Sequence, residues 1–270
     1  MKSYSAFILL LLIFAGCIQK SVTEPPRKIV NLDIGNNDSI VAIDSLMYRE
    51  ADLPIGNIFP CGEYRVVYLG DPHDTILFEE KGIIPYKTKE NDHRNIQDWT
   101  EADSTKMTIR VDTTLNLLSY ATYRKEIGGK EVEDSTAVKY VRCNIMVVRN
   151  HSDSTLYMGI NNDIGRMVMQ YQASDGKWIT GQLPIYYGCG TGARELFLRK
   201  EQIAVAKFLR GNGNIKVLAR IKFETLNGHY IYSNTFYNYI NFVPKKDFTN
   251  NDLQMWYDKY GNEVLFIARY

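Results

Sequence analysis

Short runs in which apolar and polar residues alternate, separated by turn residues, recur along most of the chain. In residues 215–224 every second side chain belongs to one apolar set, and Arg220, Lys222 and Glu224 point the other way. A period of two is typical of a strand with one buried face. Asn227-Gly228 then predicts a two-residue hairpin turn, after which the pattern continues on a return strand.

The same reasoning predicts many further strands of three to eleven residues. They cover 29–34, 39–43, 64–69, 75–78, 106–111, 117–127, 141–147, 156–160, 166–171, 178–180, 195–198 and 203–209. Gly70-Asp71-Pro72 predicts that 64–69 and 75–78 form a hairpin. One exception is residues 250–260, where Thr249 and Gly261 can cap a short helix. Closely spaced strands with little helical periodicity predict a mainly all-β protein built from antiparallel β-sandwich modules.

The N-terminus has a different pattern. Lys2 precedes ten apolar residues, 6–15, which are too few to cross a bilayer core of about 30 Å as a helix. This length is typical of the hydrophobic region of a secretory signal. Residues 18–28 are polar with a Pro25-Pro26 pair, and they read as a flexible tether.

Phe14-Ala15-Gly16-Cys17 ends the apolar stretch and resembles the bacterial lipoprotein box. The resemblance implies that diacylglycerol is attached to the Cys17 sulfur, that residues 1–16 are cleaved, and that the new amine is acylated. An ordinary cleaved signal followed by an incidental cysteine is the alternative. Several acyl chains would hold the protein firmly on a membrane. The segment after Cys17 is not acidic, which favours the periplasmic face of an outer membrane.

The stretch from residue 140 to 248 resembles an Ig-like module of exported lipoproteins of Bacteroidota type, a group without an assigned reaction. The resemblance is carried by VVRNHSDS, DGKW, YGCG, LFLRKE and YSNTFYNYINF. It covers about 40% of the chain and implies a fold but no activity.

Charge is divided unevenly along the chain. Residues 17–138 hold 14 basic and 21 acidic side chains, whereas residues 139–270 hold 17 and 10. We therefore divide the body into a β-rich region over 29–135, an Ig-like sandwich over 136–248 and a C-terminal extension over 249–270, although one larger sandwich is an alternative. The mature chain is close to neutral overall, which argues against nucleic acid as a general partner.

Three cysteines remain after Cys17. Cys143 lies in an apolar strand pattern and is expected to be a small buried residue. Cys61 and Cys189 both lie beside glycine in turn-like sequence, and they are the candidate disulfide pair.

The triplet Asp-(Ser/Thr)-X, with X a small aliphatic residue, Met or Thr, recurs seven times. Its hydroxyl residues are Ser39, Ser45, Thr75, Ser104, Thr113, Ser135 and Ser154. Asp and β-branched residues are natural at a junction between turn and strand, which is one explanation. The triplet also resembles the O-glycosylation signal of the same group of exported proteins, so these seven residues are candidate attachment sites.

Motifs for catalysis, metal binding or cofactor binding are not recognisable. The sequence has no HExxH, CxxC, GxSxG, GxGxxG or complete Ca²⁺ loop, so we predict neither a metal nor a cofactor. A hydrolase could be built from Cys189 with His229 or His151 as its base, or from carboxylates far apart in the chain. A structural cysteine is the favoured interpretation, and a protease-inhibitor-like module is a further alternative.

Aromatic residues are the remaining unusual feature. Twelve of the 19 tyrosines lie from Tyr140 onward, and residues 236–242 carry aromatic side chains on both faces of one strand. A buried strand explains this pattern, and so does an exposed binding face that includes Trp178, Tyr237 and Tyr239. We therefore expect an envelope lipoprotein that is tethered at Cys17 and binds a protein or glycan without catalysis.

Overall fold

The chain forms β-sheets throughout the part that the structure describes. The structure is a computed structural model, and it describes residues 28–35, 38–44, 61–62, 64–78, 99–100, 105–127, 130–160, 163–184, 195–211, 213–225, 228–241, 246–247, 249, 251 and 266–267. The expected strand-rich, mainly antiparallel architecture is confirmed. The expected helix over 250–260 lies almost entirely outside the described residues.

The strands are β1 (Lys28–Gly35), β2 (Asp38–Asp44), β3 (Cys61–Gly62), β4 (Arg65–Gly70), β5 (Thr75–Phe78), β6 (Trp99–Thr100), β7 (Met107–Ile127), β8 (Lys130–Asn150), β9 (Thr155–Ile160), β10 (Asp163–Ile164), β11 (Met167–Gln172), β12 (Trp178–Thr180), β13 (Leu183–Pro184), β14 (Glu195–Leu198), β15 (Ile203–Leu209), β16 (Ile215–Glu224), β17 (Tyr230–Tyr232), β18 (Phe236–Ile240) and β19 (Phe266–Ile267).

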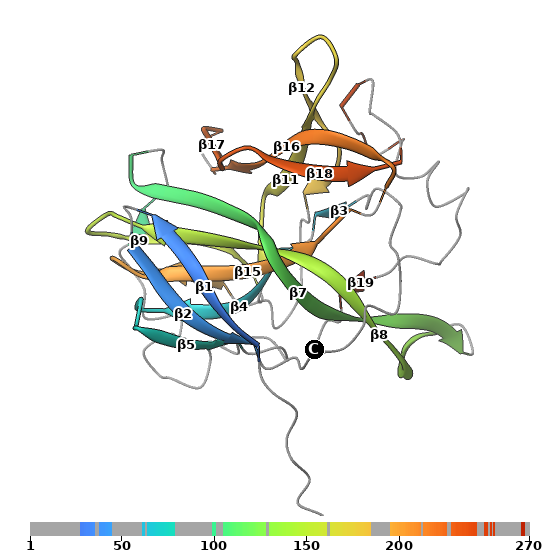
Figure 1. The fold of residues 1–270 in the computed structure, drawn as a ribbon, viewed down its shortest axis with the longest axis horizontal. Coiled ribbons are helices and arrows are strands. Elements are labelled where there is room, and N and C mark those ends of the chain that lie inside the picture. Colours follow the sequence, from blue (N-terminus) through green and yellow to red (C-terminus); the bar gives the residue numbers. More distant parts are fainter. Residues whose placement is uncertain are drawn as a thin grey trace, which may run out of the picture.

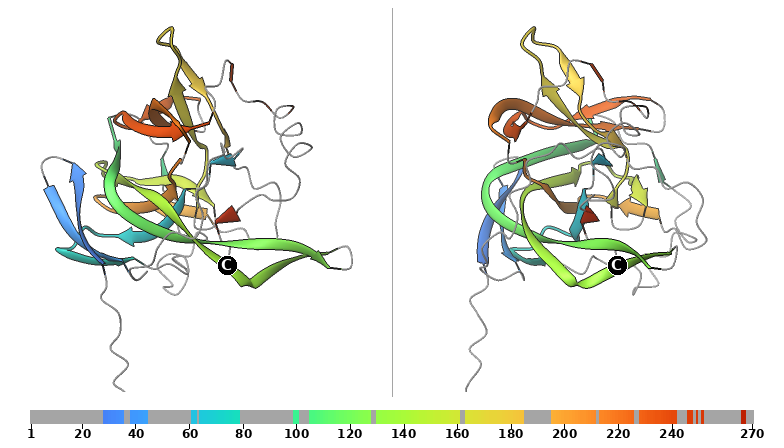
Figure 2. Two further views of the ribbon diagram at one scale, coloured as in Figure 1. Left: turned by 45° about the vertical axis from the view of Figure 1, so that its right-hand side comes forward. Right: turned by 90° about the vertical axis from the view of Figure 1, so that its right-hand side faces the viewer.

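Three sheets are stacked as layers (Figures 1 and 2). The central sheet has nine strands in the order β14-β9-β10-β4-β15-β8-β7-β19, with β6 beside β9. A three-stranded sheet, β1-β2-β5, covers one of its faces. A five-stranded sheet covers the other, with the order β12-β11-β16-β17 and with β18 also beside β16. A small parallel pair of β3 and β13 completes the described strands.

Two apolar cores hold these layers together. Met146 and Val148 of β8 lie in the first core, between the nine-stranded and five-stranded sheets. Ile145 and Val147 of the same strand lie in the second core, beneath the three-stranded sheet. Because neighbouring side chains of a strand point to opposite faces, an apolar run such as that of β8 indicates a strand buried on both sides.

Strand β7 changes faces partway along its length. Asp112 is opposite Ile145 of β8, whereas Leu117 is opposite Cys143, so β7 has three more residues than β8 in this interval. An odd number of extra residues moves the following side chains to the other face. Val111 therefore packs in the first core and Leu117 in the second.

The chain does not change layer or sheet near residue 136, where its charge changes sign. Residue 136 lies within β8, and β4 from the acidic half is hydrogen-bonded to β15 from the basic half. Strands from both halves thus share the central sheet. The hairpin predicted for 64–69 and 75–78 is wrong, because β4 lies in the central sheet while β5 pairs with β2 in parallel.

Candidate functional site

The outer face of the five-stranded sheet gathers aromatic and basic side chains. Strand β16 has its apolar residues in the first core, so its alternate residues Lys216, Arg220 and Lys222 point outward. Strands β17 and β18 flank it and expose Tyr230, Tyr232 and Tyr237, with 42–56% of each residue accessible. We call this surface the aromatic–cationic face; it comprises Trp178, Lys216, Arg220, Lys222, Tyr230, Tyr232, Tyr237 and Tyr239.

Each outward cation of β16 lies over an aromatic ring. The Arg220 guanidinium carbon is 4.2 Å from the centre of the Trp178 ring and 3.9 Å from that of Tyr232. Lys216 Nζ is 4.0 Å from the centre of the Tyr237 ring, and Lys222 Nζ is 4.1 Å from that of Tyr230. All four distances are within the range of cation–π attraction. These contacts restrain long side chains that would otherwise be mobile in water.

Arg220 is the centre of this arrangement. Its Nε donates to Gln170 Oε1 at 2.9 Å, and Gln170 Nε2 donates to Thr180 Oγ1 at 3.3 Å. Partial burial between the rings lowers the pKa of Arg220, an effect that the neighbouring Tyr232 opposes. A guanidinium nevertheless stays charged at any physiological pH. Arg220 therefore presents a fixed positive charge whose orientation is set by two rings and a carboxamide.

The structure brings Trp178, Tyr237 and Tyr239 onto this one face from two different strands, β12 and β18. The contribution of Arg220, Lys222, Tyr230 and Tyr232 was missed, although the alternation in residues 215–224 had already placed the two cations together. What the sequence does not reveal is that β12 lies two strands from β16, close enough for Trp178 to stack on Arg220.

A cleft of about 400 Å³ adjoins the face at Tyr237. Its polar wall includes Arg110, which lies 3.8 Å from an Asp33 carboxylate oxygen, and Asp112. Asp33 accepts from the Gly35 amide at 2.8 Å, and Asp112 accepts from the Thr114 amide at 2.7 Å. Both carboxylates thus hold local turns, and the cleft extends the aromatic–cationic face with a recess lined by these polar groups and by apolar side chains such as Val147.

Asn234 fixes the position of the five-stranded sheet relative to β7. Its Nδ2 donates to the Val111 carbonyl at 3.0 Å, and its Oδ1 accepts from the Val111 amide at 2.7 Å. The Asn234 carboxamide thus bonds both the backbone amide and the backbone carbonyl of Val111, as a neighbouring strand would. This link lies directly before β18, so it also sets the position of Tyr237.

The candidate glycosylation sites differ in exposure. Ser39 and Thr75 are exposed, whereas Thr113 and Ser154 are half-buried. Ser45 and Ser104 lie outside the described residues, and Ser135 lies on β8 at a position whose side chain is not described. Attachment at these residues remains a prediction.

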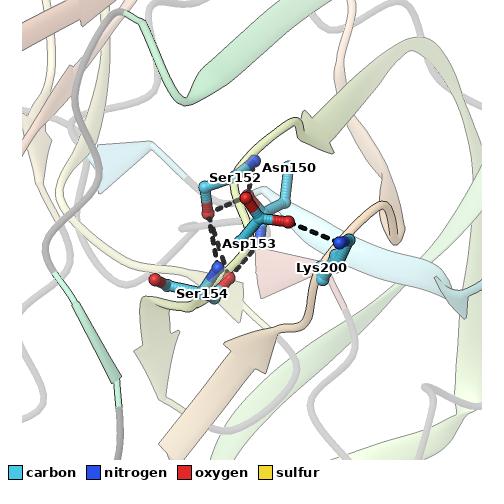
Figure 3. A network of polar contacts seen from close by, with 5 residues as sticks. All are labelled: Asn150, Ser152, Asp153, Ser154 and Lys200. Atoms are coloured by element: carbon cyan, nitrogen blue, oxygen red, sulfur yellow. Dashed lines mark hydrogen bonds and ion pairs between the residues drawn. The ribbon is translucent and has the colours of Figure 1, made fainter.

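The turn around Ser154 has a structural explanation (Figure 3). Asn150, fully buried, donates to the carbonyls of Ser154 and Leu198 at 2.7 and 2.9 Å, and it accepts from the Ser152 amide at 2.8 Å. Asp153 forms an ion pair with Lys200 at the surface. The turn is therefore organised from its buried side by Asn150.

Replacing Asn150 by Ala is expected to destabilise the protein by about 2–3 kcal/mol, because buried carbonyl and amide groups lose their partner. Replacing Asp153 by Ala should leave the melting temperature almost unchanged, because exposed ion pairs contribute little. Urea denaturation of the two variants checks both expectations. A larger loss for Asp153→Ala than for Asn150→Ala would show that the surface pair organises the turn.

The candidate residues for nucleophilic catalysis are not brought together in the described part of the chain. Cys143 is buried in the second core, as expected. Cys61 lies in β3 beside Leu183, and Cys189 lies outside the described residues, as does Cys17. His151 contacts Thr108 Oγ1 at 2.9 Å through Nε2, and His229 lies in the turn before β17.

The described residues contain no group of three or more His, Cys, Asp or Glu side chains placed to hold a metal ion. Among them there is also no helix long and apolar enough to span a bilayer. No family model, curated protein or solved structure matches the chain.

Proposed function

We propose that the protein is an envelope lipoprotein, tethered to the outer membrane through Cys17, that binds an envelope protein or glycan through its aromatic–cationic face without catalysis. The observation that carries this proposal is the stack of cations on exposed rings over one sheet face. Tyr, Trp and Arg are the residues that most often dominate binding energy. The lipoprotein-type N-terminus supports the tether and a position on the periplasmic side.

The architecture supports an Ig-like sandwich as the binding module. The nine-stranded and five-stranded sheets pack face to face around the first core, as the two sheets of a sandwich do. The five-stranded sheet then has one buried face and one exposed face. Ordered rings and cations on the exposed face lose little conformational entropy when a partner binds, which favours affinity.

Variants of the face test this proposal. Replacing Arg220 and Tyr232 together by Ala should lower the recovery of the partner by about tenfold or more, since residues of this kind contribute roughly 2 kcal/mol each at binding hot spots. The measurement is a cross-linked pull-down of the tagged, lipidated protein from its own envelope, quantified by mass spectrometry. Arg142→Ala removes an exposed arginine of β8 elsewhere and is the matched control.

Wild-type protein and Arg142→Ala are expected to recover the same partner in near-equal amounts. Thermal melting of all variants must show that they remain folded. Equal recovery by the Arg220→Ala/Tyr232→Ala variant would contradict a binding role for the face. Recovery of a partner by none of the proteins would contradict an accessory role in the envelope.

A further inference from the structure

The outer face of the three-stranded sheet carries a short row of apolar side chains. Ile29 is 67% exposed and Leu77 is 44% exposed, and the other large apolar side chains exposed to this degree in the described residues are tyrosines of the aromatic–cationic face. Ile43 lies between them, opposite Ile29 on β1 and opposite Leu77 on β5. We call Ile29, Ile43 and Leu77 the apolar row.

On this face, the row of described residues beside the apolar row is uncharged. The next row of the sheet consists of Asn31, Val41 and Thr75. The acidic residues Asp33, Asp38 and Asp74 lie toward the opposite end of the sheet, as the pairing of its strands shows. The described residues of the apolar row and of the row beside it could therefore lose their water without burying a charge, whereas those at the other end could not.

The apolar row is held rigidly on the body. Lys28, Asp44 and Phe78 form the adjacent row, on the inner face. Asp44 accepts from Lys207 Nζ at 3.0 and 3.1 Å, so it fixes the end of β2 to β15 of the central sheet. Lys28 Nζ also donates to the Asn116 carbonyl. A surface carried in this way has one orientation relative to the rest of the protein.

The apolar row lies close in sequence to the expected membrane anchor, and this indicates which surface covers the row. Ile29 is the second residue of β1, and Cys17 lies twelve residues before it. Even a fully extended tether of this length spans no more than about 43 Å. An anchor at Cys17, or one in the apolar stretch before it, therefore keeps this end of the three-stranded sheet close to a bilayer.

We propose that the apolar row rests on the bilayer that holds the anchor. This inference depends on the proposed tether at Cys17. Three side chains are too few to hold a protein on a membrane alone. The anchor, however, already keeps the apolar row at a high local concentration near the lipid. The row therefore orients the protein: the three-stranded sheet faces the lipid, and the aromatic–cationic face, on the opposite outer layer, faces away from it.

Methyl NMR of the lipidated protein on nanodiscs tests this orientation. The discs contain phosphatidylethanolamine and phosphatidylglycerol, with and without nitroxide-labelled lipid, and the Ile δ1 methyl groups are labelled. The signals of Ile29 and Ile43 should lose most of their intensity with the nitroxide lipid. Those of Ile179 and Ile231, both in the five-stranded sheet, should keep theirs. Ile29→Asn/Leu77→Asn should restore the Ile43 signal, whereas Tyr230→Asn should not.

Two results would overturn the proposal while leaving the anchor intact. One is protein that stays on the disc while Ile29 and Ile43 keep their full intensity. The other is an O-glycan on Thr75, since it would stand beside Leu77 on the same face and prevent contact with lipid. Protein that does not stay on the disc would instead contradict the Cys17 anchor, and the orientation with it.

Discussion

Replacing Lys207 by Met is expected to lower the free energy of unfolding by about 3–5 kcal/mol, the usual cost of removing one member of a buried ion pair. Lys207 and Asp44 are both almost completely inaccessible to water. Lys207 also donates to the Leu118 carbonyl at 2.8 Å, and its ammonium lies 5.5 Å from the centre of the Phe78 ring. The substitution would leave the Asp44 carboxylate in the second core without its main cation.

The double variant Lys207→Met/Asp44→Leu separates the missing charge from the lost contacts. It should recover most of the stability, because apolar side chains of similar size often replace a buried pair at little cost. Chemical denaturation of the wild type, both single variants and the double variant gives the coupling energy. Single variants that lose less than about 1 kcal/mol, the level of a surface pair, would contradict a buried pair at this position.

Replacing Gly213 by Ala is expected to cost about 3 kcal/mol, at the upper end of overpacking effects. A Cβ atom at Gly213 would lie 1.9 Å from the carbonyl carbon of Ile240, which is backbone and cannot rotate away. The Gly213 amide also donates to the Tyr239 carbonyl at 3.3 Å. The change should push β18 away from this segment, and it should therefore also displace Tyr237 and weaken binding at the aromatic–cationic face.

Gly176→Ala is the matched control for this prediction. Nothing lies within 4 Å of a Cβ at Gly176, so its cost comes from its φ of +83° alone and should be about 1 kcal/mol. Urea denaturation of the two variants measures the difference. A Gly213→Ala variant as stable as Gly176→Ala would show that β18 does not pack against the Gly211–Gly213 segment as described.

Alternation in the sequence was sufficient to locate most strands and to assign their buried faces. In β16 the predicted inward residues Val217, Ala219, Ile221 and Phe223 all lie in the first core. The hairpin from β16 to β17 is confirmed, with a longer loop than predicted. The Thr225 amide donates to the His229 carbonyl, and Gly228 has the positive φ of +75° that such loops require.

Strand pairing was harder to predict, because alternation identifies a face but not a neighbour. Gly70-Asp71-Pro72 ends β4 as expected, but the chain then crosses to another layer, where β5 pairs with β2. The division of the body near residue 136 rests on the reversal of charge there, which carries no information on strand pairing. Net charge describes the surface, and the surface does not determine which strands share a sheet.

The candidate site was predicted in part. Trp178, Tyr237 and Tyr239 were identified because they are aromatic residues in strand-like sequence. The cations between them were identified as outward-facing but were not assigned to the site, because their stacking depends on β11 lying between β12 and β16. This long-range strand pairing brings Arg220 to Trp178, and it cannot be predicted from the local pattern of apolar and polar residues.

Site-specific photo-cross-linking in living cells tests the binding role of the aromatic–cationic face most directly. The photoreactive residue p-benzoylphenylalanine would replace Tyr237 in one protein and Arg142 in a control, both exposed positions. We predict a discrete adduct with an envelope protein or glycan from position 237, and none from position 142. Equal labelling from both positions, or no adduct from position 237 in folded and lipidated protein, would contradict the proposed function.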